Sequence, residues 1–94
     1  MIIHRVTATT HVGQTEKLVE LMKTEARALF QVSRISTFAN PDESESRIVI
    51  FDLDFDDMVG FEAWRAAIPN NQDFFDRWGS LVESYTGQLL RTDS

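Results

Sequence analysis

The chain has 94 residues, of which 43% are hydrophobic and 11% aromatic, and these values are typical of one small globular domain over residues 1–94. A formal net charge of −6 and nine scattered basic residues argue against nucleic acid or an anionic membrane surface as a partner. The chain has no cysteine, which excludes disulfides and thiolate chemistry, and no apolar run that could span a bilayer, so a cytoplasmic protein is expected.

The first half of the chain predicts two strands around one helix. Residues 2–9 alternate and are rich in β-branched side chains, as a strand requires. Residues 14–30 place apolar side chains at helical spacing, with Glu and Lys between them. Residues 32–38 indicate a second strand, and the polar stretch 40–46 indicates a turn.

Residues 47–55 form the clearest strand pattern of the chain. The odd positions are all apolar, and they are Val49, Phe51, Leu53 and Phe55. The even positions are two isoleucines, Ile48 and Ile50, followed by two acids, Asp52 and Asp54. We expect the odd face to lie under helices and the even face to pack on a second sheet around a partly polar cavity. A symmetric homodimer would provide that second sheet.

Two helices and a short strand are predicted for the rest of the chain. Asp56 or Asp57 is a suitable cap for a short helix whose apolar face carries Met58, Phe61, Trp64 and Ile68. Residues 69–71 break this helix. The next helix starts after Asn71 and its apolar positions are Phe74, Phe75, Trp78, Leu81, Val82 and Tyr85. Gly87 is expected at its C-terminus, before a closing strand over 88–92.

The order β-α-β-β-α-β predicts an α+β, ferredoxin-like fold with an antiparallel four-stranded sheet and both helices on one face. The chain resembles the dimeric α/β-barrel superfamily, near the antibiotic-biosynthesis-monooxygenase and NIPSNAP-like domains. The resemblance covers essentially the whole chain and rests on the opening strand with Gly13, the segment Phe61–Ala66, the Pro-Asn break and the segment Phe74–Trp78. It implies a dimeric barrel in which the first and third strands are central, adjacent and parallel.

Charged and titratable residues supply several candidates for a site. Arg5 could meet Asp52 or Asp54 on the cavity side of the sheet, either to orient an acidic or phenolic ligand or as a structural ion pair. His4 and His11 are the only histidines, and each is either a general base or a surface residue. The acidic run after position 51 lacks the glycine and the final glutamate of a calcium loop, and we predict no metal site and no cofactor.

The resemblance implies further site residues. Trp64 matches the pocket tryptophan of the monooxygenases, Arg91 is a second candidate match, and Tyr85 is a weaker one. Trp78 is interpreted as a core residue. The haem-degrading branch is disfavoured, because the first strand has no asparagine and the last helix has no histidine.

Three functions remain open at this point. The first is a cofactor-independent monooxygenase of a small aromatic phenol or quinol, with Trp64 in the pocket wall, Arg91 or Arg5 on the anion, and His4 or a water in proton transfer. The second is a non-catalytic dimeric module that binds a small apolar ligand or assists assembly. The third is an isomerase or cyclase, which would need His4 or Asp52 pointing inward as an acid or base.

Overall fold

The computed structural model describes residues 1–39, 41–42 and 46–93, so the turn predicted over 40–46 lies largely outside the described residues. Its elements, in chain order, are β1 (Ile2–Thr10), α1 (Thr15–Leu21), the π-helical turn η1 (Met22–Ala26), α2 (Arg27–Leu29), β2 (Val32–Thr37), β3 (Ile48–Phe55), α3 (Met58–Ala66), the 3-10 turn η2 (Ile68–Asn71), α4 (Gln72–Leu81) and β4 (Val82–Arg91). Within these ranges no helix has the length and apolar character needed to cross a membrane.

The four strands form one open antiparallel sheet with the order β2-β3-β1-β4. This confirms the α+β, ferredoxin-like class. The expectation that the first and third strands run parallel is wrong, because β1 and β3 pair antiparallel. The helical connection through α1 and α2 brings β2 back in the direction of β1, and the connection from β2 to β3 then reverses the chain.

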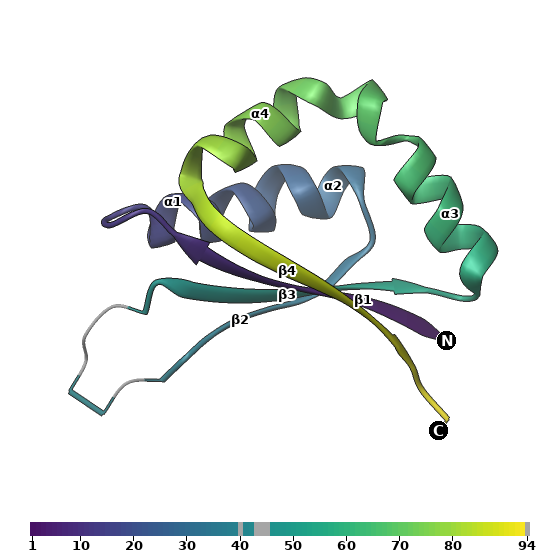
Figure 1. Cartoon of the computed structure of the whole chain (residues 1–94), viewed down its shortest axis with the longest axis horizontal. Helices are drawn as coiled ribbons and strands as arrows, with labels where there is room; N and C mark the ends of the chain where they lie inside the picture. The colour runs from purple at the N-terminus through teal and green to yellow at the C-terminus, as the bar shows by residue number, and fades with distance from the viewer. Residues whose placement is uncertain (40, 43–45, 94) are drawn as a thin grey trace.

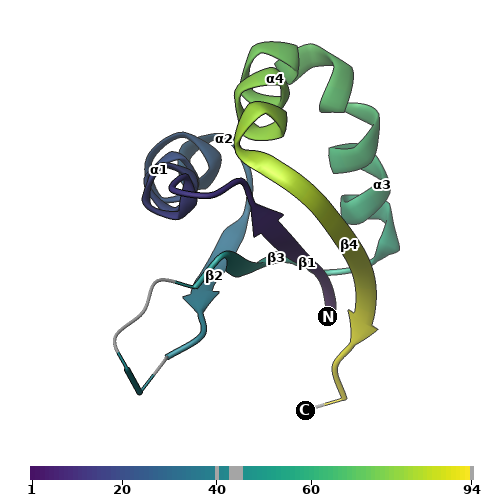
Figure 2. The same cartoon turned by 60° about the vertical axis from the view of Figure 1, so that its left-hand side comes forward.

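The helices cover one face of the sheet (Figure 1). Turned by 60°, the molecule shows α1 with α2, and α3 with α4, as two groups above that same face (Figure 2). Beneath them lie the odd positions of β3, whose exposed fractions are 5% or less, as predicted. The helical segments α1 and η1 contribute Leu18, Met22 and Ala26, which are spaced by four residues and are buried against the sheet. The core is therefore the layer between this sheet face and the helices.

The boundary between α4 and β4 differs from the prediction. Residues Val82 to Tyr85 continue the apolar spacing of the helix, but α4 ends at Leu81 and the chain from Val82 onward pairs with β1. Gly87 lies opposite Val6 within the strand and not at a helix C-terminus. The strand forms in place of a longer helix because the longer helix would leave the outer hydrogen-bonding edge of β1 without a partner.

Candidate functional site

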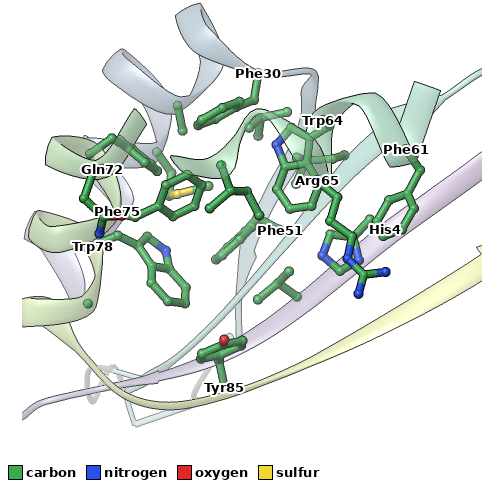
Figure 3. A pocket seen from close by; sticks show the side chains of 18 residues that line it. His4, Phe30, Phe51, Phe61, Trp64, Arg65, Gln72, Phe75, Trp78 and Tyr85 are labelled. Carbon is green, nitrogen blue, oxygen red and sulfur yellow. The ribbon is translucent and has the colours of Figure 1, made fainter. Parts of the chain in front are cut away.

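A cavity of about 480 Å³ lies between the helix-covered face of the sheet and the helical segments η1, α3 and α4 (Figure 3). This volume falls within the range of sites for small organic molecules. Most of the wall is apolar, and its aromatic members include Phe30, Phe51, Phe61, Trp64, Phe75 and Trp78. The cavity thus belongs to the helix side of a single chain. A cavity between two sheet faces, which the sequence also predicts, would need a second copy and stays a prediction.

His4 reaches this cavity from β1. The centroid of its ring lies 5.3 Å from that of Phe61 and 5.2 Å from that of Trp64. Burial lowers the pKa of His4 below 6.5, and a weaker opposing effect comes from a hydrogen bond with the backbone of Gln88. The imidazole is therefore neutral at pH 7. Its Nδ1 is buried and has no hydrogen-bond partner in the described part of the chain.

Gly87 makes room for this imidazole. A Cβ atom at position 87 would lie 3.0 Å from Cε1 of His4, which is closer than carbon atoms normally approach. The glycine that the sequence suggested as a helix end is thus a strand residue beside the cavity.

Trp64 faces His4 from α3 (Figure 3). The helix begins after Asp57, whose side chain accepts a hydrogen bond from the backbone N–H of Gly60 at 3.1 Å, so Asp57 is the cap. From this start, Phe61 and Trp64 stand three residues apart and point toward the sheet. The indole ring lies among aromatic rings, with centroid distances of 5.8 to 6.3 Å to Phe61, Phe55 and Phe30. Its Nε1 is buried without a hydrogen-bond partner among the described residues.

Arg5 and Asp52 form the pair that the sequence suggested, on the even face of β3, which lies opposite the helices and the cavity described above. They are direct neighbours across β1 and β3, and Nε and Nη2 of Arg5 donate hydrogen bonds of 2.8 and 3.0 Å to the two carboxylate oxygens. Asp52 is 3% exposed, and Arg34 approaches it to 4.0 Å. The carboxylate raises the pKa of Arg5 through these hydrogen bonds and through its charge. Neither Arg5 nor Asp52 lines the cavity.

The remaining candidates are divided between the cavity and the surface. Tyr85 and Trp78 both line the cavity, and their ring centroids lie 5.1 Å apart. Trp78 also contacts Phe51 of the core, so it is a core residue and a wall residue together. Arg91 and His11 are exposed and do not line the cavity. The roles of Arg5 and Arg91 toward a ligand's anion stay predictions.

Arg65 is a wall residue that the sequence interpretation missed. A signal was present, because Arg65 follows Phe61 by four residues and therefore interrupts the apolar face of α3 with a charge. A cation in an apolar stripe suggests either a side chain that extends to solvent or a partner of opposite charge.

Comparison with known proteins adds the fold family. No protein-family model and no curated protein matches the chain. An uncharacterised NIPSNAP domain protein from Burkholderia xenovorans is 20% identical, with a TM-score of 0.71 over 100% of this chain and 96% of that one. A NIPSNAP family protein from Agrobacterium tumefaciens is 17% identical, with a TM-score of 0.76 over 98% and 92%. A protein from Deinococcus radiodurans, proposed to be an antibiotic biosynthesis monooxygenase, is 13% identical, with a TM-score of 0.70 over 100% and 94%.

The chain has the ferredoxin-like fold of these NIPSNAP and monooxygenase-type structures. The predicted resemblance is thereby confirmed for the fold. At 13 to 20% identity the comparison says nothing about substrate or reaction, which depend on the side chains of this chain.

Proposed function

We propose that the cavity binds a polycyclic phenol or quinol and that the protein is a cofactor-independent monooxygenase of this substrate. The observation that carries the proposal is an aromatic cavity with His4 and Trp64 in its wall, where Nδ1 of His4 and Nε1 of Trp64 are buried and have no hydrogen-bond partner in the described chain. Buried polar atoms are nearly always hydrogen-bonded in proteins, so a ligand oxygen that reaches them after a rotation of either ring would supply the missing partner. The two rings are neighbours in the wall, with their centroids 5.2 Å apart.

The two side chains have complementary roles toward such a phenol. The indole N–H of Trp64 donates a hydrogen bond to the phenolic oxygen. The neutral imidazole of His4 accepts the phenolic proton, which its lowered pKa permits at pH 7. The phenolate that results is stabilised by the indole N–H, and its ring becomes electron-rich enough to reduce dioxygen.

The reaction balances without another reductant. In a phenol with a conjugated CH₂ group, that carbon forms a bond to one atom of dioxygen and the O–O bond breaks. The carbon loses its two hydrogens and becomes a carbonyl, and the second oxygen atom leaves with them as water. The aromatic wall favours this chemistry because it provides an apolar surface for the ring of the substrate and for apolar dioxygen.

The proposal includes a homodimer formed through the open face of the sheet. This face carries Ile3, Ile48 and Ile50, all of them only partly buried in the single chain, around the Arg5–Asp52 pair. Apolar side chains in the middle of a sheet face are normally covered by another layer. Sedimentation of the wild type and of an Ile50→Lys variant tests this part, and a wild-type monomer at micromolar concentration would contradict it.

Turnover of hydroxyanthrones, which carry the required CH₂ group, under isotopically labelled dioxygen tests the reaction, with the product followed by mass spectrometry. We expect one labelled oxygen atom in the product. His4→Gln should lower kcat/KM by about a hundredfold, the usual contribution of a general base. Trp64→Phe, which keeps a ring but removes the N–H, should lower it by about tenfold. His11→Gln is the matched control, and because His11 is exposed and outside the cavity its activity should equal that of the wild type.

The same assay separates the two other functions. Ligands that bind without any product would identify a non-catalytic binding module. A rearranged product that carries no labelled oxygen would identify an isomerase or cyclase with His4 as the base, since Asp52 faces away from the cavity.

A further inference from the structure

Arg65 is the charged side chain in the wall of the cavity. The other wall residues are apolar or polar, and the polar ones include His4, which is neutral at pH 7, and Gln72. The chain as a whole carries a formal charge of −6, so Arg65 is a cation in the cavity wall of an otherwise acidic protein. Local charge of this kind selects ligands of opposite sign.

The guanidinium of Arg65 is available for a ligand. Its side chain is 67% exposed, and its nearest ion-pair partner is Glu62, with Nη1 and Oε1 3.9 Å apart. That distance is too long for a hydrogen bond, and exposed pairs of this type contribute little. Two other arginines have closer partners, since Arg5 is held by Asp52 and Arg47 by the carbonyl oxygen of Thr10.

Arg65 also lies at the same end of the cavity as His4 and Phe61 (Figure 3). It follows Trp64 directly and stands one helical turn after Phe61, and both of these residues contact His4. Figure 3 shows the side chain of Arg65 extending from α3 at that end. The wall opposite, formed by Phe75 and Trp78 of α4, is aromatic.

We propose that the cavity binds its aromatic ligand as an anion, with the ligand's oxyanion on the guanidinium of Arg65 and its rings against the aromatic wall. This inference rests on the proposed site and names the substrate class, an aromatic carboxylate or phenolate. A guanidinium offers several N–H donors in one plane, which suits the oxygens of a carboxylate. It also supports the proposed reaction, because a nearby cation lowers the pKa of a bound phenol.

Binding of two ligands of equal shape tests the inference without any turnover. Naphthoate and naphthamide differ in charge, and tryptophan fluorescence or calorimetry gives the Kd of each. The wild type should bind naphthoate about tenfold more tightly than naphthamide, the effect of one charge-assisted hydrogen bond. In Arg65→Gln this preference should disappear, with the affinity for naphthamide unchanged. Arg65→Lys should keep part of it.

Arg27→Gln is the matched control, because it removes the same charge from an exposed helix position outside the cavity. It should bind both ligands like the wild type. A naphthoate preference that survives in Arg65→Gln would overturn the inference, and so would a wild type that binds neither ligand.

Absorbance titration of bound naphthol distinguishes the two sources of the oxyanion. A pKa about one unit below that of free naphthol, lost in Arg65→Gln, supports the inference and assigns the phenolic oxygen as the group on Arg65. An unshifted naphthol together with the naphthoate preference supports it and assigns a carboxylate. If Arg65 governs binding but no oxygenated product ever forms, the anion site stands and the monooxygenase proposal fails. If turnover occurs without either effect of Arg65, this inference alone fails.

Discussion

Replacing Gly87 by alanine tests the position of His4 with a single methyl group. The new Cβ would lie 3.0 Å from Cε1 of His4, whereas carbon atoms prefer about 3.5 to 4.0 Å, so the imidazole has to move away from β4 by about 0.5 Å. Alanine restricts the unfolded chain more than glycine and so stabilises a strand by about 0.5–1 kcal/mol, which offsets the crowding. We therefore expect the free energy of unfolding to change by less than about 1 kcal/mol.

The effect on the site should be larger than the effect on stability. Misplacement of a reacting group by about 1 Å can cost a hundredfold in rate, so a shift of half that size should lower kcat/KM by about tenfold. The added methyl group also desolvates the imidazole and should lower the pKa of His4 further, which NMR titration measures independently of turnover.

Gly60→Ala is the matched control for this substitution. Its Cβ would meet Phe55 at 3.5 Å, an ordinary contact, and position 60 does not line the cavity. We expect α3 to become more stable by about 0.5–1 kcal/mol in urea unfolding, with unchanged ligand affinity. If Gly87→Ala keeps both the wild-type activity and the wild-type titration of His4, then the contact between Gly87 and the imidazole does not position the base.

Three further predictions concern pH and packing. The folded-state pKa of His4 lies below its unfolded value, so the neutral form stabilises the fold above about pH 6.5, and this contribution is lost as the pH falls through the folded pKa. In urea unfolding, His4→Gln should therefore remove this dependence of the unfolding free energy on pH, and His11→Gln should retain it. Phe61→Ala removes a ring that is 6% exposed and should lower the free energy of unfolding by about 3 kcal/mol, measured in urea. Asp52→Asn leaves Arg5 without its carboxylate and should lower Tm without changing ligand affinity, because the pair is remote from the cavity; weaker ligand binding at an unchanged Tm would contradict this placement.

Much of the fold could be predicted from the sequence because its determinants are local. The alternation in β3 identified the buried face correctly, since successive side chains of a strand point to opposite sides. The helical spacing before Phe30 predicted the long first helix, although η1 inside it has no signature that the periodicity reveals. The α4–β4 boundary could not be found this way, because Val82 and Tyr85 fit a helix locally and belong to a strand only once β1 is beside them.

The candidate site was predictable in part, because some of its residues could be identified one at a time from the sequence. His4 and Trp64 were identified as single residues, one as a titratable group and one from the resemblance, and the structure brings them together at the cavity. Arg65 was missed, although its place on the apolar face of α3 was visible in the spacing.

The sequence by itself determined the order of the elements, the buried face of β3 and the types of side chain available for chemistry. Only the tertiary structure decided that β1 runs antiparallel to β3, that Arg5 and Asp52 face away from the cavity, and that Arg65 faces into it. The physical reason is that periodicity records whether a side chain is buried, but not against which partner. The face of the sheet on which the helices pack, and hence the place of the cavity, depends on contacts between residues far apart in the chain.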